Sequence, residues 1–468
     1  MQLRPLPLPR TFWLLLIVAA LVRVGVLAAM PDALRADPDG YRQLAENVLE
    51  HGVLGHGPVP TAYRPPAYPL LLVPCVALGA GTRVAIGMLH VLLGLATVGL
   101  TFALARRAGM KDIPAALAAG FVALDPILLA QSALVMSETL AALLVVLGVW
   151  LLDRCTHRPT VGNAALAGAA WGGVVLCRPG LLPFAALTAI LLPWLAATAR
   201  NAEMQRGSKE EKGKRGSEEE QRRWRSAAQV FAGIVAGLAI VVGPWVVRNQ
   251  VAFARPIAAT THGGYTLLLG NNPFFYEHLR SGRWFQAWDA EPFHDWWRRQ
   301  RLAAGLSTSA TGDSDSGVMH DAAPQPLSSP AVELQTDALA YRHAFAVIRR
   351  QPGTFAWSCL VRAGHFWSPL PYRLSPDESS LRRAARYGVA AWYAAVFTLA
   401  AIGLGPVLFR ENGIRRSVFA WSLLAALALT AVHTFYWSNL RMRAPLIPLV
   451  AIAAAEGATS LQRRRMRT

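Results

Sequence analysis

Long apolar segments recur along this chain and constrain its fold more than any other feature. They are rich in Leu, Ala, Val and Ile and carry few charges. The eleven segments are 11–29, 67–80, 84–105, 113–130, 133–152, 162–178, 180–197, 228–247, 387–409, 416–436 and 444–461. A helix needs about 20 mainly apolar residues to cross a bilayer. The sequence therefore predicts an all-α polytopic membrane protein with about 11 transmembrane helices.

The composition agrees with this fold class. Only 16% of the 468 residues are charged, whereas soluble domains have roughly 25%, and the mean hydropathy is +0.31. The net charge of +18 lies largely at segment ends and in one loop, where the positive-inside rule and anionic lipids explain it. We therefore predict membrane lipids, and not nucleic acid, as partners. The cysteines show no paired spacing, which argues against a disulfide scaffold or a cysteine-based zinc site.

The segments divide the chain into three parts. Residues 1–247 form an N-terminal transmembrane module with a first loop at 30–66, residues 248–386 form a large Trp-rich loop, and residues 387–468 hold the last transmembrane helices. The first 30 residues fit either a cleaved signal peptide or a retained first span; the many later spans favour retention. A charged loop at 198–227 and a low-complexity insert at 307–329 interrupt this pattern.

Basic residues predict the orientation. Arg4 and Arg10 before the first segment, and the run at 463–467 after the last, place both termini in the cytoplasm. The loops 30–66 and 248–386 then share the external face of the inner (plasma) membrane. Eight apolar segments precede residue 248, yet this topology needs an odd number of crossings. One segment must be irregular, either 67–80, which contains two prolines, or one within 113–152.

The first loop carries a helical pattern. Apolar residues recur at Tyr41, Leu44, Ala45 and Val48, which predicts an amphipathic helix in the membrane interface. Asp37 followed by Pro38 fits the N-cap and first position of that helix. Asp39 fits its first turn, where a carboxylate favours the helix dipole. On the pattern alone, both aspartates have a purely structural interpretation.

Six further stretches carry a family resemblance in their order and spacing. They are "DPDGYRQLA" (37–45), "RPPAYP" (64–69), "LVMSETLAALL" (134–144), "LCRPGLLPF" (176–184), "GPWVVRNQVAF" (243–253) and "RMRAPLIP" (441–448). Together they resemble the GT-C superfamily of membrane glycosyltransferases, in the protein-mannosyltransferase and aminoarabinose-transferase branch (glycosyltransferase family 39-like). The chain departs from that pattern at Pro38, where many relatives have Glu. The large loop is then expected to be helical.

The resemblance implies an enzyme. Members of this superfamily transfer a sugar, with inversion, from a polyprenyl-phosphate donor to a lipid, glycan or protein acceptor at the external membrane face. Such a reaction needs a base for the acceptor and positive charge for the leaving phosphate. The resemblance assigns the base to Asp37, with Asp39 as the second candidate. Glu138, at the start of an apolar segment, is a third catalytic candidate, or else a helix cap after Ser137.

Other predicted site residues are cations and polar groups of the same motifs and of the two large loops. The predicted phosphate ligands are Arg64, Arg248, Arg441 and Arg443. The predicted acceptor or sugar contacts are Tyr41, His56, Tyr68 and Asn271. Snorkelling towards the lipid surface is the alternative for the arginines. Arg178 is interpreted as a topological residue, and Arg23 as an intramembrane functional candidate.

Two alternatives to a catalytic enzyme remain. A lipid or glycolipid transporter or flippase predicts internal repeats and ionisable residues near the middle of the membrane. No repeat is visible, and the acidic residues cluster in the predicted external loops. A non-catalytic scaffold predicts the loss of Asp37 or of the Arg441–Arg443 pair, and both are present. We predict no cofactor, although a divalent metal stays open because some members of the superfamily depend on one.

Overall fold

The computed structural model describes residues 9–204, 216–283, 286–306, 329–373, 378–410 and 414–466. Nearly all of the insert predicted at 307–329, the middle of the charged loop, and Trp284 lie outside the described residues. The described chain is predominantly α-helical, which confirms the predicted fold class.

All eleven predicted apolar segments are helical. The helices that contain them are α1 (Arg10–Ala29), α3 (Ala67–Val76), α4 (Thr82–Arg107), α5 (Asp112–Ala123), α6 (Pro126–Ser132), α7 (Glu138–His157), α8 (Val161–Cys177), α9 (Leu182–Met204), α10 (Gly216–Phe253), α16 (Ser380–Arg410), α17 (Ile414–Phe435) and α18 (Ile447–Arg465). The short 3-10 helices η2 (Gly79–Gly81), η3 (Pro179–Leu181) and η5 (Leu440–Leu446) adjoin three of them.

Eight of the described helices are long and apolar enough to span a membrane, or nine if the bent pair α5–α6 is one span. The predicted count of about 11 is therefore too high by this criterion. Both places where the sequence allowed an irregular segment are irregular. Helix α3 has only 10 residues, and α5 and α6 meet at 51°. The break occurs because Asp125 caps α6, accepting a hydrogen bond from the Leu128 N–H at 2.9 Å, and Pro126 begins the new helix.

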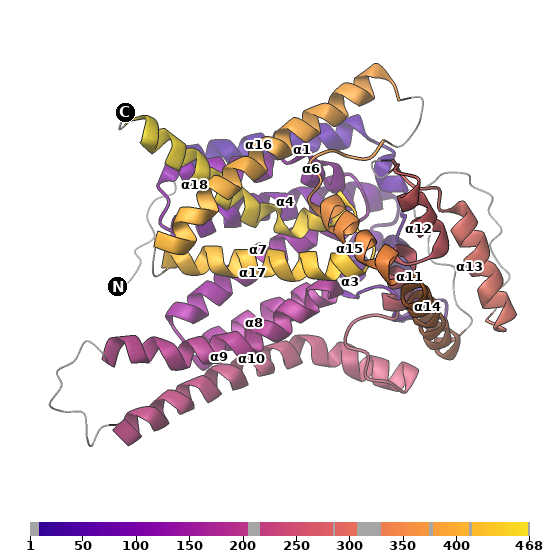
Figure 1. Ribbon diagram of the computed structural model, residues 1–468, viewed down its shortest axis with the longest axis horizontal. Helices are drawn as coiled ribbons and strands as arrows, with labels where there is room; N and C mark the ends of the chain where they lie inside the picture. The colour runs from indigo at the N-terminus through magenta and orange to yellow at the C-terminus, as the bar shows by residue number, and fades with distance from the viewer. Residues whose placement is uncertain are drawn as a thin grey trace.

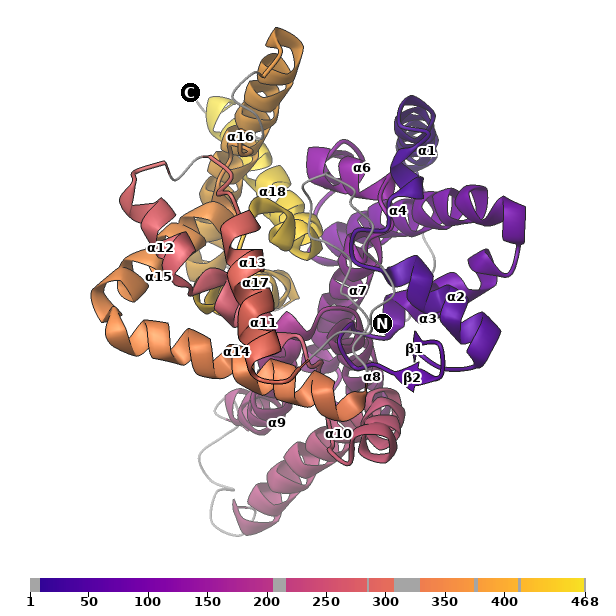
Figure 2. The ribbon, with the colours of Figure 1, turned by 90° about the vertical axis from the view of Figure 1, so that its right-hand side faces the viewer.

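The loop elements gather at one end of the helical bundle (Figure 1). The first loop holds η1 (Ala33–Arg35), α2 (Tyr41–His51) and a hairpin of β1 (Gly55–His56) and β2 (Val59–Pro60). The large loop holds α11 (Gly263–Gly270), α12 (Pro273–Arg280), α13 (Glu291–Ala303), α14 (Pro330–Arg350) and α15 (Pro352–Trp367). Seen from that end, α2, α3 and the hairpin lie on one side and α11–α15 on the other (Figure 2). The C-terminal end of α18 lies at the opposite end of the bundle.

Glycines allow two pairs of helices to approach closely. A Cβ atom added to Gly168 on α8 would fall on the backbone carbonyl of Ile234 on α10. A Cβ atom on Gly403 of α16 would likewise fall on the carbonyl of Ala453 on α18. Small residues at helix contacts are the usual means of packing membrane helices.

The first-loop helix begins later than predicted. Helix α2 starts at Tyr41, and its N-cap is Gly40, whose φ of 70° lies in the left-handed region that glycine tolerates. The prediction of Asp37 as N-cap and Pro38 as first helical residue is therefore wrong. The apolar face of α2 packs against α3, as the buried pair Tyr41 and Tyr68 shows, with ring centroids 5.2 Å apart. The helix is amphipathic as predicted, but much of its apolar face meets protein.

Candidate active site

A cavity of about 590 Å³ lies between the first loop and the large loop. Its lining comes from six separate stretches of the chain. These stretches lie within 39–65, 177–183, 259–269, 294–301, 333–341 and 429–442. The cavity thus collects the two loops that the sequence predicts on one face, together with the ends of membrane helices.

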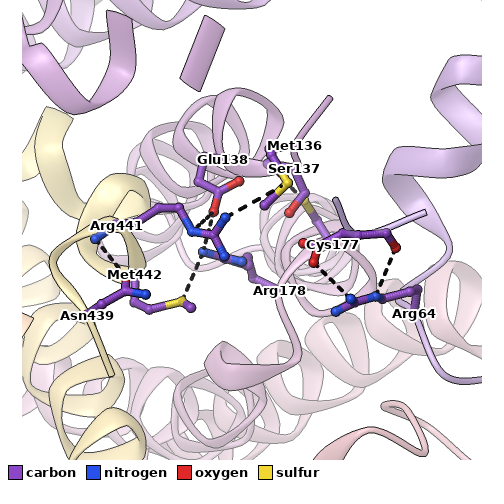
Figure 3. A network of polar contacts seen from close by, with 10 residues as sticks. Arg64, Met136, Ser137, Glu138, Cys177, Arg178, Asn439, Arg441 and Met442 are labelled. Atoms are coloured by element: carbon purple, nitrogen blue, oxygen red, sulfur yellow. Dashed lines mark hydrogen bonds and ion pairs between the residues drawn. The ribbon is translucent and has the colours of Figure 1, made fainter. Parts of the chain in front are cut away.

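Two arginines that line this cavity meet one buried carboxylate (Figure 3). The Oε1 atom of Glu138 lies 3.1 Å from Nη2 of Arg178 and 3.3 Å from Nε of Arg441. Glu138 is fully buried. Within the described part of the chain its other oxygen, Oε2, has no hydrogen-bond partner. The three residues together carry one net positive charge, so the cluster favours an additional anion.

Local structure positions each member of this cluster. Glu138 is the first residue of α7, and Arg178 follows the last residue of α8, where Pro179 begins η3. Arg441 lies in η5, whose N-cap Asn439 accepts a hydrogen bond from the Arg441 N–H at 3.0 Å. The ends of three elements therefore converge on one carboxylate.

A second ion pair lies in the first loop. Nη2 of Arg64 is 2.8 Å from Oδ1 of Asp39, and Nε of Arg64 donates to the Asp39 carbonyl at 3.1 Å. The guanidinium therefore fixes both the side chain and the backbone of Asp39. Both residues line the cavity, and Asp39 is buried.

Asp37 occupies a different position. Its Oδ2 accepts a hydrogen bond from the Gln43 N–H at 3.0 Å, at the N-terminus of α2, and it does not line the cavity. Burial raises the pKa of Asp37, while the N–H groups of the helix end oppose that rise. Asp37 therefore holds the start of α2 from outside the helix, and its Oδ1 is buried with no hydrogen-bond partner among the described residues.

Helix α14 contributes two carboxylates. Glu333 is buried and accepts hydrogen bonds from the Thr61 hydroxyl at 2.6 Å and the Ala62 N–H at 2.9 Å, so it ties the first loop to the large loop. One turn later, Asp337 accepts from the Gly264 N–H at 2.7 Å. Burial raises the pKa of Asp337 to about 6.

Five of the predicted site residues line the cavity. They are Asp39, Tyr41, His56, Arg64 and Arg441. Glu138 lies behind the lining and pairs with Arg178 and Arg441, as described above. Burial lowers the pKa of His56 and raises that of Tyr41, so both side chains are neutral at pH 7.

Two predicted phosphate ligands lie outside the cavity lining. Arg248 donates to the carbonyls of Thr61 at 2.9 Å and Leu54 at 2.7 Å, which secures the first loop. Arg443 is fully buried, donates to the carbonyls of Phe366 and Ser368, and lies 4.3 Å from the ring centroid of Tyr393. Backbone carbonyls bind both terminal nitrogens of Arg248 and one nitrogen of Arg443. The assignment of these two residues as phosphate ligands stays a prediction.

Two predicted substrate contacts are also structural. The Tyr68 hydroxyl lies 2.7 Å from Nε2 of His90 in the buried core. Asn271 is fully buried, donates to the Leu267 carbonyl at 2.8 Å and the Phe435 carbonyl at 3.0 Å, and accepts from the Tyr276 hydroxyl. Neither residue lines the cavity, and their assignment as substrate contacts stays a prediction.

Sequence reasoning missed several lining residues. Arg178 was interpreted as topological, and Arg301 and Asp337 were not singled out. The Arg-Pro pair at 178–179 was visible within a family motif and could have raised the rank of Arg178. Glu333 and Asp337 lie four residues apart in the large loop, which was expected to be helical, and this spacing also offered a signal. Arg23, predicted as an intramembrane functional candidate, donates to backbone carbonyls of α5.

No group of three or more His, Cys, Asp or Glu side chains among the described residues is arranged to hold a metal ion. The tryptophans of the large loop mostly pack with one another and with phenylalanines; Trp288, for example, lies 5.5 Å from Phe275 between ring centroids. Trp297 also lines the cavity.

The fold and the cavity define a class: a polytopic α-helical membrane protein with an arginine-rich cavity at one end of its bundle. Within that class the predicted resemblance is confirmed. The sequence model of the family described as dolichyl-phosphate-mannose-protein mannosyltransferase matches residues 76–242. This match includes Glu138 and Arg178. No curated protein gives a significant sequence match.

Solved structures of two kinds are similar to the chain. One is the oligosaccharyltransferase AglB from Archaeoglobus fulgidus, in complex with an inhibitory peptide and a dolichol-phosphate (15% identity, 97% of this chain and 50% of that chain, TM-score 0.49). Another is ArnT from Cupriavidus metallidurans bound to undecaprenyl phosphate (16% identity, 93% of this chain and 78% of that chain, TM-score 0.38). The chain spans about half the length of the archaeal structure.

Proposed function

We propose that this chain is an inverting membrane glycosyltransferase that moves a hexosyl or pentosyl group from a polyprenyl-phosphate donor to an acceptor hydroxyl or amine. The observation that carries the proposal is the cavity in which Arg178 and Arg441 meet at Glu138 while Asp39 lines the same space. The family match over 76–242 supports the donor class.

The arginine pair is the proposed phosphate site. A phosphate leaving the sugar gains negative charge, and preformed cations in a partly buried site stabilise that charge. Arginine suits the task because its planar guanidinium binds phosphate through two parallel hydrogen bonds. Glu138 holds both guanidinium groups in place through one oxygen and leaves the pair with a net positive charge.

Asp39 is the proposed base. It accepts the proton of the acceptor group as the acceptor oxygen or nitrogen forms its bond to the anomeric carbon. The bond between that carbon and the phosphate oxygen breaks, and its electron pair leaves with the phosphate. Attack opposite the leaving group gives inversion. Arg64 orients Asp39, as a third group orients the base in many active sites. Asp37 is the second candidate, as its carboxylate is engaged by α2.

The proposed location is the inner membrane, with the cavity at the external face and both termini in the cytoplasm. The grouping of both loops at the end of the bundle away from the C-terminal end of α18 supports this topology. The basic run at 463–467 supports a cytoplasmic C-terminus.

Replacement of each aspartate by asparagine tests the base. The purified full chain, reconstituted in lipid vesicles, is supplied with radiolabelled polyprenyl-phosphate sugars and an extract of cell-envelope acceptors. Asp39→Asn should lower transfer by about 10²–10⁴-fold, the range for loss of general acid–base catalysis. Asp37→Asn should lower transfer less, and its main effect should be a lower melting temperature.

Full transfer by Asp39→Asn would overturn the assignment of the base to Asp39, and a selective loss in Asp37→Asn would move it to Asp37. Mass spectrometry of glycolipids and glycoproteins, with and without the gene, would name the sugar and acceptor. Unchanged glycans in the deletion strain would contradict a transferase that acts on these acceptors.

A further inference from the structure

Helix α13 presents a second basic surface to the cavity. Its lining residues are His294, Trp297, Arg298 and Arg301. Their spacing of three, four and seven residues places them on one helix face. Helix α13 belongs to the large loop, whereas Arg178 and Arg441 adjoin membrane helices. The cavity therefore has two basic surfaces built from different parts of the fold.

Arg301 differs from the other arginines that line the cavity. Arg64 pairs with Asp39, and Arg298 pairs with Asp295 at 3.2 Å. Among the described residues, the Arg301 side chain forms no hydrogen bond or ion pair, and its Nε is buried without a partner. Tyr63 and Tyr265, which bear hydroxyl groups, line the same cavity as Arg301.

Within the part of the chain that the structure describes, no carboxylate pairs with Arg301. Burial lowers the pKa of Arg301, yet a guanidinium group remains protonated in proteins at neutral pH. A partly buried cation without a partner is costly, and an anion that pairs with it recovers that cost. Tyrosine hydroxyls donate hydrogen bonds to carboxylate or phosphate oxygens. The arrangement has the composition of an anion-binding subsite.

We propose that Arg301, Tyr63 and Tyr265 form an acceptor subsite for a molecule that carries a carboxylate or phosphate group. This inference rests on the proposed function, because that function assigns the donor phosphate to Arg178 and Arg441 and leaves the loop side of the cavity to the acceptor. The position of Arg301 on a loop helix outside the candidate spans fits an acceptor that enters from the aqueous face.

Binding of small sugars to the detergent-purified full chain tests the subsite. The probes are glucose 6-phosphate, galacturonic acid and, as the uncharged control, glucose, with the intrinsic fluorescence of the chain as readout. Glucose 6-phosphate, galacturonic acid or both should bind at least about tenfold more tightly than glucose, the gain expected from charge-assisted hydrogen bonds. Whichever binds tightly identifies the anion as phosphate or carboxylate.

Arg301→Gln should abolish this preference, and Arg301→Lys should restore part of it. Arg299→Gln is the matched control, because Arg299 lies on the same helix but is exposed and does not line the cavity. It should keep the preference. If the Gln and Lys variants at position 301 have the melting temperature of the wild-type chain, their fold is intact.

The affinity for undecaprenyl phosphate separates the two basic surfaces. It should be the same in Arg301→Gln as in the wild type. If Arg301→Gln weakened the binding of undecaprenyl phosphate as much as the binding of the anionic sugar, the acceptor assignment would be overturned. Arg301 would then belong to the donor site. Anionic preference that survives in Arg301→Gln, or is absent from the wild type, would overturn the subsite. Because binding needs no transfer, an inactive chain with Arg301-dependent binding would refute the proposed function alone.

Discussion

At the residue scale, the meeting of Arg178 and Arg441 at Glu138 gives the cavity its chemical character. A buried carboxylate shared by two guanidinium groups costs less to bury than one alone, because each charge has a partner. The remaining positive charge is available for a ligand anion. Arg443, two residues beyond Arg441, lies in the core and anchors η5, so neighbouring arginines of one motif have different roles.

Loss of one guanidinium should weaken binding of the carrier lipid. Arg178→Gln should raise the Kd for undecaprenyl phosphate by roughly 10–100-fold, because a hydrogen bond to a charged group contributes about 1.5–3 kcal/mol. Arg35→Gln is the control, since Arg35 is exposed, pairs with Asp32 in the first loop and does not line the cavity. Calorimetry with the lipid in detergent measures both, and similar affinities for the two variants would contradict the phosphate site.

The raised pKa of Asp337 predicts a pH-dependent stability. Its pKa rises from 3.8 to about 6 on folding, so the folded chain binds more protons than the unfolded chain between these values. Asp337 therefore lowers stability as pH rises through this window. Asparagine keeps the acceptor for the Gly264 N–H but cannot ionise. Asp337→Asn should raise the melting temperature at pH 8 and change it less at pH 5. An equal change in melting temperature at the two pH values would contradict the raised pKa of Asp337.

Sequence reasoning reached part of the site. Asp39, Arg64 and Arg441 were predicted from motifs and do line the cavity. Contacts between segments that are distant in the sequence could not be predicted from local patterns. Glu333 binds the N–H of Ala62, 271 residues earlier in the chain, and no local pattern encodes such a contact. For the same reason, the backbone contacts that occupy Arg248 could not be distinguished from a ligand site.

At the element scale, close helix packing stabilises the bundle. Helices α16 and α18 approach until Gly403 meets the backbone of Ala453 and Gly457. Helices α8 and α10 do the same through Gly168 and Gly237. Such contacts replace the hydrophobic effect, which does not drive helix association within lipid.

A matched pair of glycines tests this packing. Gly403→Ala should destabilise the chain by about 1–3 kcal/mol, because the added methyl group has no room beside a backbone. Gly405→Ala, on the same helix, should be neutral or stabilising, since nothing lies within 4 Å of its added Cβ atom and alanine favours a helix. Thermal unfolding in detergent compares the two. Similar melting temperatures for the two variants would show that the close approach of α16 and α18 at Gly403 does not contribute to stability.

Elements were predicted well where periodicity is strong and less well at their ends. Each apolar segment is helical, because its length and composition leave few alternatives. The start of α2 was placed too early because Gly40 adopts a left-handed φ that ends the preceding turn. The break between α5 and α6 depends on the Asp125 cap, whose effect within an apolar run is hard to read from sequence.

At the scale of the whole molecule, the cavity of the proposed enzyme faces away from the cytoplasm. Helix α12 is followed by exposed Ser281 in the large loop, and Gln462 is exposed near the C-terminal end of α18. A membrane-impermeant maleimide should label Ser281→Cys in intact spheroplasts, and Gln462→Cys only after lysis. The parent chain, with three of its four cysteines buried, measures the background. Labelling of Gln462→Cys in intact spheroplasts, with Ser281→Cys labelled only after lysis, would contradict the proposed topology.

The most direct measurement is sugar transfer by the purified chain. Wild-type protein in lipid vesicles, given a panel of radiolabelled polyprenyl-phosphate hexoses and pentoses with envelope acceptors, should move label from one donor to the acceptor and release polyprenyl phosphate. The double variant Arg178→Gln, Arg441→Gln should lose this transfer while the exposed control Arg35→Gln retains it. Transfer by the double variant at the wild-type rate would contradict the account.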